Sequence, residues 1–252
     1  MLSQDLFQLK KNYNYIFKLK SPNPEEKSSS LISVYQIGLL KMKDLIYFNI
    51  LTPYLYEKFM NQLRTKEALG YIVSIKPFNT YGYCGMQNII ESNSYTPEFC
   101  AERVRNFYKE IYQTIKNKTE EEFQMYAKDL FNSLDEKDKD LFVVFERNWD
   151  KIKKNTYDFD KDERKKENLK KCNKEGFIKF FEKYFINEVA ISDCEYLCDA
   201  HYEQNEKDLK EPKISEEGNI KKRIICDSIE DFQACNELGF VCNNPVFRSN
   251  YN

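Results

Sequence analysis

The chain has 252 residues, of which 41% are hydrophobic, 15% aromatic and 32% charged, and its net charge is −2. Its aromatic content is sufficient for a packed core, which excludes a disordered chain, and seven glycines are too few for collagen or a glycine-rich linker. There is one histidine, His201. Because imidazole is the commonest metal ligand and general base, this count excludes a His-rich zinc site, a haem with two histidine ligands, and a Ser-His-Asp triad beside a separate His-based metal site within this chain.

The sequence shows no targeting or membrane-spanning segment. The first 20 residues mix charged and amide side chains with single aromatics, and the longest apolar runs, such as residues 45–48, are far too short to cross a bilayer. Lysines alternate with acidic residues, even in the basic-looking run at 161–171, which argues against a nucleic-acid interface. We therefore predict a cytoplasmic protein that binds neither a membrane nor a nucleic acid.

The eight cysteines include no C-x-x-C pair and are sparse for a disulfide scaffold. Their simplest interpretation is as reduced thiols that fill core positions. Cys194, Cys198 and His201 have a C-x3-C-x2-H spacing that would suit half of a metal site, but the sequence lacks a second pair of ligands. We expect no metal site here, and we expect His201 to lie in an exposed loop.

The chain begins with a strand signal. Alternating apolar residues at 15–19 predict a first strand, and residues 31–39 (LISVYQIGL) predict a second one. The segment 21–30 between them is rich in Ser and Pro, which is typical of a turn. The two strands are therefore predicted to pair as a hairpin.

Helical spacing follows from residue 42 to about residue 69. Pro53 is expected to kink this helix or to mark a second start, and Gly70 is expected to end it at the C′ position. Residues 71–75 and 83–90 then have strand character on either side of a turn signal. They are predicted to form a second hairpin.

The second half of the chain carries three helix-start signals. Thr96 precedes Pro97 as an N-cap, Thr119 and Glu122 form a capping-box pattern, and Asn173 can cap a third helix. Apolar residues at helical spacing predict the buried faces: Cys100, Val104, Phe107, Ile111 and Ile115; Phe123, Ala127, Leu130 and Leu134; and Phe177, Ile178, Phe181 and Phe185.

The apolar pattern at 141–152 continues after a charged break, and its aromatic residues, Trp149 included, are predicted to pack in the core. Residues 160–171 form a polar helix or coil, and residues 188–197 return to a strand. The order β-β-α-β-β-α-α-α-α-β predicts an α+β fold, a largely antiparallel sheet with helices packed on one face. We assign residues 1–198 to one domain and residues 199–252 to a polar hinge and C-terminal tail.

Residues 61–73 (NQLRTKEALGYIV) hold the densest functional signal. They predict the last turns of an amphipathic helix, a glycine stop and the start of a strand. The guanidinium of Arg64 offers several donors in a fixed fork, and the phenol of Tyr71 can donate to a developing oxyanion. The two could face one cleft. Equally, Arg64 could be a surface cation that favours the helix C-terminus, and Tyr71 a half-buried strand residue.

The same segment resembles the L-R-T-K-E-x-L-G-Y motif of the insulinase (insulin-degrading enzyme) and pitrilysin family of zinc metallopeptidases, specifically the last of that family's four domains. Weaker matches follow in the same order across residues 15–240, among them the TEEEF segment at 119–123 and the YDFD segment at 157–160. The resemblance implies a metallopeptidase-like α+β domain and a peptidase made of two halves that close around a chamber.

What the resemblance implies for the site is residue-specific. Arg64 would bind the substrate backbone, Tyr71 would bind substrate and stabilise the oxyanion in trans, and Met60 would line the pocket beside the scissile bond. Ala68 departs from the family, which commonly has Gln there. The family's zinc and general-base glutamate lie in an H-x-x-E-H motif, which a chain with one histidine cannot contain.

The sequence therefore leaves three hypotheses. In the first, the chain is the zinc-free C-terminal portion of an insulinase-type metalloendopeptidase, inactive alone, with peptide substrates and with zinc on its partner, the N-terminal half of the same peptidase. The two halves would be one polypeptide or two chains. In the second, it is a catalytically inert structural or partner-binding module of the same fold. The third, a small cysteine-based metal module, predicts stoichiometric zinc, which we do not expect.

Overall fold

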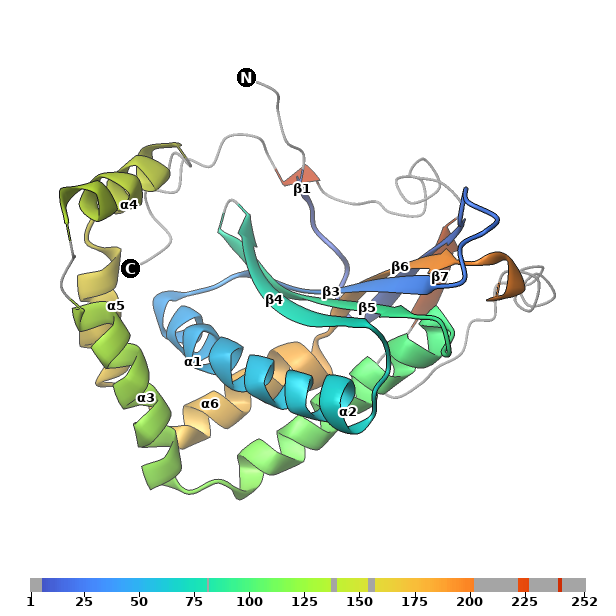
Figure 1. The fold of residues 1–252 in the computed structure, drawn as a ribbon. Helices are drawn as coiled ribbons and strands as arrows, with labels where there is room; N and C mark the ends of the chain where they lie inside the picture. The colour runs from blue at the N-terminus through green and yellow to red at the C-terminus, as the bar shows by residue number, and fades with distance from the viewer. Residues whose placement is uncertain are drawn as a thin grey trace.

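The structure is a computed structural model that describes residues 6–80, 82–136, 140–153, 157–201, 222–226 and 240–241. A six-stranded sheet with the order β4-β5-β3-β6-β2-β7 forms its centre (Figure 1). A separate two-stranded pair joins β1 to β8. The strands are β1 (Leu6–Phe7), β2 (Tyr13–Lys20), β3 (Ser29–Leu39), β4 (Ile72–Thr80), β5 (Tyr83–Ser92), β6 (Ala190–Leu197), β7 (Lys222–Cys226) and β8 (Phe240–Val241).

Helices cover one face of this sheet, as the sequence predicted. In Figure 1, α1, α2 and α6 lie below the sheet, and α3, α4 and α5 stand at its side. The helices are α1 (Met42–Phe59), its π-helical continuation η1 (Met60–Lys66), α2 (Pro97–Asn117), α3 (Glu120–Asp135), α4 (Leu141–Lys153), α5 (Lys161–Leu169), α6 (Lys174–Phe181) and its π-helical continuation η2 (Glu182–Asn187). The predicted α+β class is confirmed, and α5 settles the segment left as helix or coil.

The first predicted hairpin is wrong. Strand β6 lies between β2 and β3, parallel to β2 and antiparallel to β3. The second hairpin, β4 with β5, is confirmed and is longer at both strands than predicted. The sheet thus has three antiparallel pairings and two parallel ones, β2 with β6 and β2 with β7.

A buried carboxylate explains the place of β6. Asp193 of β6 is 1% exposed and accepts hydrogen bonds from Asn14 of β2 at 2.9 Å and from Ser33 of β3 at 2.5 Å. Arg105 of α2 supplies the countercharge at 3.4 Å. Because a buried charge is costly unless it is paired and hydrogen-bonded, this set of partners favours the one strand order that assembles them.

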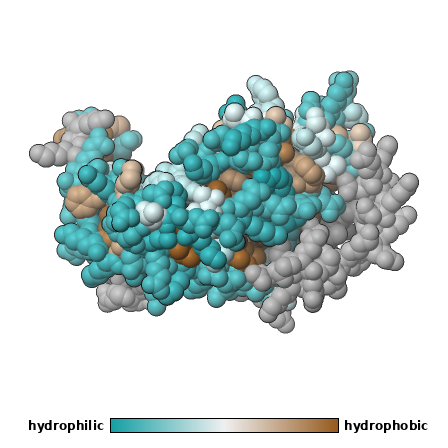
Figure 2. Space-filling model, turned by 90° about the horizontal axis from the view of Figure 1, so that it is seen from below, coloured by the Kyte–Doolittle hydropathy of each residue, from teal (hydrophilic) through white to brown (hydrophobic). Residues whose placement is uncertain are grey.

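The core lies between the sheet and the helices. All of the predicted α2 face is buried, as are Phe123, Ala127, Phe177, Phe181 and Phe185, while Ile178 and Leu130 pack against it. The outer surface of this helical layer, seen from below in Figure 2, is mostly hydrophilic with separate hydrophobic residues. The helices therefore have the amphipathic pattern that the spacing predicted.

The predicted helix starts are also confirmed. Thr96 accepts a hydrogen bond from the Phe99 amide, and Asn173 accepts one from Gly176. Thr119 and Glu122 form the full capping box.

Pro53 does not mark a second helix start, since α1 runs through it. Proline cannot donate to the carbonyl four residues earlier, which belongs to Asn49. The hydroxyl of Thr52 donates to that carbonyl instead, at 3.2 Å. This replacement bond removes one reason for the helix to break.

Changing Thr119 to Ala is expected to lower the free energy of unfolding by about 1 kcal/mol, because it removes the N-cap acceptor of α3. Urea unfolding followed by circular dichroism measures the change. Ser133, near the other end of the same helix, hydrogen-bonds only within it, so Ser133→Ala is the control and should stay within about 0.5 kcal/mol of the parent. Equal effects of the two substitutions would contradict a capping role.

The prediction that the aromatic residues of 141–152 pack in the core is wrong. None of the α4 residues is buried; Leu141 is 83% exposed and Trp149, stacked on Phe145, is 52% exposed. Periodicity shows that a helix has an apolar face, but it does not show what covers that face. No residue of the apolar face of α4 belongs to the main core.

The predicted tail contributes to the sheet. Strand β7, beyond residue 198, pairs with β2 in parallel register from Tyr13↔Lys222 to Phe17↔Cys226. The polar hinge and C-terminal tail predicted for 199–252 otherwise lie largely outside the described residues. A domain boundary at residue 198 stays a prediction, and β7 is a part of the sheet that this boundary would separate.

Candidate functional site

The predicted site residues lie on the segment 60–71, which joins α1 to β4 and which we call the connection. Met60 begins η1 and is partly buried, Arg64 lies in the last turn of η1 and is exposed, and Tyr71 immediately precedes β4. Tyr71 is 88% exposed, so the alternative of a half-buried strand tyrosine is wrong. A π-helical turn adds a residue to a helix and is found frequently at functional sites.

Apolar residues fix this connection to the main core. Leu63 is fully buried and Leu69 and Val73 are nearly so, all within the main core. The backbone amide of Leu69 also donates to the carbonyl of Leu63 at 3.0 Å. Arg64 and Tyr71 therefore project to solvent from a segment whose alternate residues are held in the core.

Gly70 does not have the role predicted for it, which was to end the helix at the C′ position. The residue with positive φ after η1 is Ala68, at +48°, and not Gly70. Gly70 is required for another reason: a Cβ there would lie 2.0 Å from the backbone oxygen of Glu91 on β5. The sequence position of a glycine does not distinguish a left-handed backbone from a close approach, and here the second applies.

Neither Arg64 nor Tyr71 has a hydrogen bond or ion pair with any residue that the structure describes. Their donors, a guanidinium and a phenol hydroxyl, are therefore available to a ligand. Both groups can donate to carbonyl oxygens, and the guanidinium can do so with two parallel bonds. The arrangement suits recognition of a peptide backbone.

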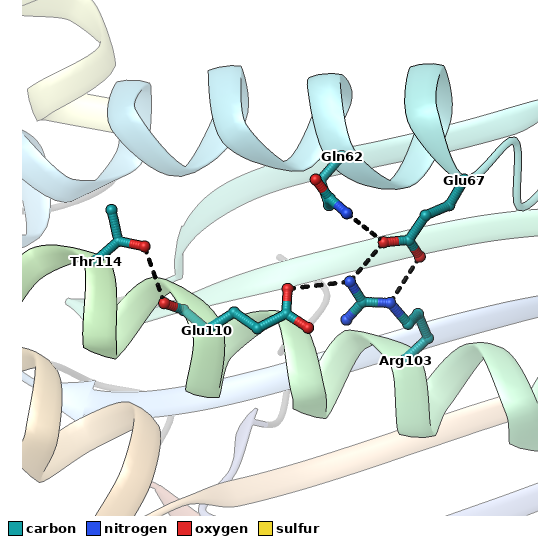
Figure 3. A network of polar contacts seen from close by, with 5 residues as sticks. All are labelled: Gln62, Glu67, Arg103, Glu110 and Thr114. Carbon is teal, nitrogen blue, oxygen red and sulfur yellow. Dashed lines mark hydrogen bonds and ion pairs between the residues drawn. The ribbon is translucent and has the colours of Figure 1, made fainter.

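A polar network joins the same connection to α2 (Figure 3). Arg103 donates from Nε to Oε2 of Glu67 at 2.6 Å and from Nη2 to Oε1 at 2.5 Å. Gln62 of η1 donates to Oε1 of Glu67 at 2.6 Å, and Arg103 also reaches Glu110 at 3.1 Å. Thr114 donates to the backbone oxygen of Glu110 at 3.0 Å.

The contacts within this network favour the charged forms of Glu67 and Arg103. Burial alone would raise the pKa of Glu67, but the hydrogen bonds from Arg103 and Gln62 outweigh it, and the pKa lies below its usual value. The hydrogen bond to Glu67 is the main cause that raises the pKa of Arg103. Sequence reasoning missed Arg103, because nothing in the chain indicates a pairing between residues 36 positions apart.

The residues that the structure describes do not form a zinc site. In the described part of the chain, no group of three or more His, Cys, Asp or Glu side chains could hold a metal ion. His201 lies in a partly buried helical turn, not in an exposed loop as predicted, and its Nδ1 is 2.7 Å from the hydroxyl of Ser29. Burial raises the pKa of Cys100 to about 12, so this thiol is protonated in the core.

Sequence comparison agrees with the fold and the motif. Residues 50–149 match the family model described as PQQ synthase PqqF-like, C-terminal lobe domain 4. The chain is 26% identical over 238 residues to the insulin-degrading enzyme of Drosophila melanogaster, covering 94% of this chain and 24% of that protein. It is 32% identical over 147 residues to the human insulin-degrading enzyme, covering 58% of this chain and 14% of that protein.

Solved structures show the same fold. The crystal structure of pitrilysin superimposes with a TM-score of 0.68 at 16% identity, covering 96% of this chain and 24% of that one. A peptidase M16 inactive domain from Pseudomonas fluorescens superimposes with a TM-score of 0.53 at 14% identity, covering 77% of this chain and 46% of that one. The fold is thus that of a metallopeptidase-type α+β domain.

The chain is similar to members of the insulinase and pitrilysin family of metallopeptidases, and the similarity is to their C-terminal domain. It spans less than a quarter of the length of the fly and human enzymes that it matches.

Across the described residues, no helix is both long and apolar enough to pass through a membrane. Relatives and structural neighbours include an insulin-degrading enzyme-like protein named as peroxisomal, from Arabidopsis thaliana, and the periplasmic protease PqqL from Escherichia coli. The predicted cytoplasmic location stays a prediction.

Proposed function

We propose that this chain supplies peptide-binding and oxyanion-stabilising side chains to a zinc peptidase site on another part of the enzyme. The observation that carries the proposal is the pair Arg64 and Tyr71. Both are exposed on a connection fixed by buried Leu63 and Leu69, and neither is engaged by the described residues. Because the backbone that carries them is fixed, only these two side chains have to be ordered when a ligand binds.

Each residue has a distinct role in the proposal. The guanidinium of Arg64 donates to a carbonyl of the substrate backbone. The hydroxyl of Tyr71 donates to the scissile carbonyl oxygen, which gains negative charge when the carbon is attacked. Met60, one turn before Arg64 and partly buried, lines the pocket for the side chain next to the scissile bond.

The proposed partner is the zinc-bearing N-terminal half of the same peptidase, within one polypeptide or as a separate cytoplasmic chain. The much greater length of the relatives supports this, as does a neighbour with the same fold described as the first half of the protease PqqL. The zinc supplies Lewis-acid chemistry there. This chain contributes donors only. We call this chain together with the zinc-bearing half the assembled peptidase.

Arg64→Ala is expected to raise the KM of the assembled peptidase for a fluorogenic peptide about tenfold, the effect of losing a charge-assisted hydrogen bond. Steady-state kinetics measure it. Lys66, another exposed cation in the same turn, provides the control, and Lys66→Ala should change KM less than twofold. An Arg64→Ala enzyme with the parent's KM would overturn the assignment.

One observation favours the second candidate, an inert partner-binding module. Leu141, Phe145 and Trp149 expose an apolar face on α4, and large exposed apolar patches mark interaction sites. In that case the chain would bind a partner protein through α4. Binding measured by calorimetry would then be lost in Trp149→Ser and unchanged in Arg64→Ala, and the assembled peptidase would not require Tyr71.

A further inference from the structure

The positions of Arg64 and Tyr71 depend on the backbone between them. Neither side chain is held by a polar contact with the described residues, so a displacement of this connection would move both donors. Leu69 and Gly70 fix its second half through the core and through the close approach to Glu91. In the first half, where the chain leaves η1, Glu67 makes the charged contact with α2.

Glu67 occupies the middle of the connection, three residues after Arg64 and four before Tyr71. Both of its carboxylate oxygens accept from Arg103, and Gln62 binds one of them from within η1 (Figure 3). A two-bond pairing between guanidinium and carboxylate fixes orientation as well as distance. The side chains are mostly withdrawn from solvent, with 15% of Arg103 and 22% of Glu67 exposed, so the pair is weakly screened.

The other end of the contact lies on a helix that is packed into the core. Arg103 lies on α2 between the buried residues Cys100, Val104 and Phe107, which pack in the main core. A bond from Glu67 to Arg103 therefore joins the connection to the helix layer as a fixed support. The sheet holds the connection on its other side through β4.

We propose that Arg103 is a positioning residue for Arg64 and Tyr71, acting through its two-bond contact with Glu67. This inference rests on the proposed function, since it concerns how the same two donors are held. Without the contact, the connection retains its apolar anchors but loses the orientation of its middle residue. Misplacement of a binding group by about 1 Å can reduce rates by up to a hundredfold.

The first test is Arg103→Gln in the assembled peptidase. We expect kcat/KM for a fluorogenic peptide to fall about tenfold, and Arg103→Lys, which keeps the charge but loses the fork, to fall between Arg103→Gln and the parent. Glu110→Gln is the control, because Glu110 contacts Arg103 but not Glu67; it should stay within twofold. If Arg103→Gln also stays within twofold, the positioning role is wrong.

A second test separates positioning from a loss of folded protein. In the Arg64→Ala/Tyr71→Phe background there are no donors left to position, so adding Arg103→Gln should change the residual rate less than twofold. A purely structural role would reduce the rate tenfold in this background as well, and that result would overturn the proposal.

The same experiment distinguishes a failure of the proposed function from a failure of the positioning role of Arg103. If Arg64→Ala/Tyr71→Phe retains the parent's activity, the proposed function itself fails. If that double variant is impaired while Arg103→Gln matches the parent, the positioning proposal alone fails. Glu67→Gln should lower kcat/KM as Arg103→Gln does, and combining the two should add less than twofold, because both remove one contact.

Discussion

Replacing Tyr71 by Phe is expected to lower the kcat of the assembled peptidase about a hundredfold. The substitution removes one hydroxyl from a side chain that is 88% exposed and that bonds to no described residue, so the thermal stability should not change. The hydroxyl stabilises charge that develops only after the carbonyl is attacked. Its loss should therefore lower kcat and leave KM nearly unchanged.

This split is the informative part of the measurement. Arg64 binds the ground state and the transition state alike, so its removal affects mainly KM, whereas the removal of the Tyr71 hydroxyl affects mainly kcat. Tyr56 on α1 is 54% exposed, and Tyr56→Phe is a matched control that should match the parent. A kcat for Tyr71→Phe within twofold of the parent would exclude oxyanion stabilisation by this residue.

The second large effect is expected on stability. Gly70→Ala should lower the free energy of unfolding by roughly 3 kcal/mol, at the upper end for overpacking. The new Cβ would lie 2.0 Å from the oxygen and 2.8 Å from the carbon of the Glu91 carbonyl. Backbone atoms cannot swing aside as a flexible side chain can, so the start of β4 must move away from β5.

Gly38 provides the matched control for Gly70. Its φ is +97°, but a Cβ there would meet nothing within 4 Å. Gly38→Ala therefore tests backbone strain without a clash, and we expect it to cost about 1 kcal/mol. Urea unfolding of both variants measures the difference. A smaller loss in Gly70→Ala than in Gly38→Ala would show that the close approach to Glu91 is relieved at little cost.

Local signals predicted the helices well. Caps at Thr96, Thr119 and Asn173 work between residues three apart, so the interacting groups are visible in the sequence itself. Apolar spacing likewise predicted the buried faces of α2 and α6. These features depend on neighbours along the chain, and the fold class follows from their order.

Features that depend on distant partners were missed. Strand spacing gave no indication that β6 lies between β2 and β3, because this order depends on Asp193 meeting Asn14 and Ser33. The apolar pattern of α4 resembles that of α2, yet one helix faces the core and the other is exposed. Amphipathicity specifies a face and not its partner.

In the candidate site, too, the features set by neighbours along the chain were predicted and those set by distant partners were not. The motif at residues 61–73 located Arg64 and Tyr71 on a helix end and a strand start, and the structure has them there. It did not indicate that Ala68 has positive φ, nor that Arg103 supports Glu67. Both depend on how α2 and β5 pack against the connection.

The place of β2 in the sheet has a consequence during protein synthesis. Its two neighbours, β6 and β7, both come from the C-terminal quarter of the chain; Asn14 and its partner Asp193 are 179 residues apart. At about 5–20 residues per second, a ribosome would leave β2 without either neighbour for roughly ten to forty seconds. Over that interval its unpaired edges and aromatic residues are open to chaperones or to incorrect strands. Strand β2 is thus vulnerable during synthesis until β6 and β7 have emerged.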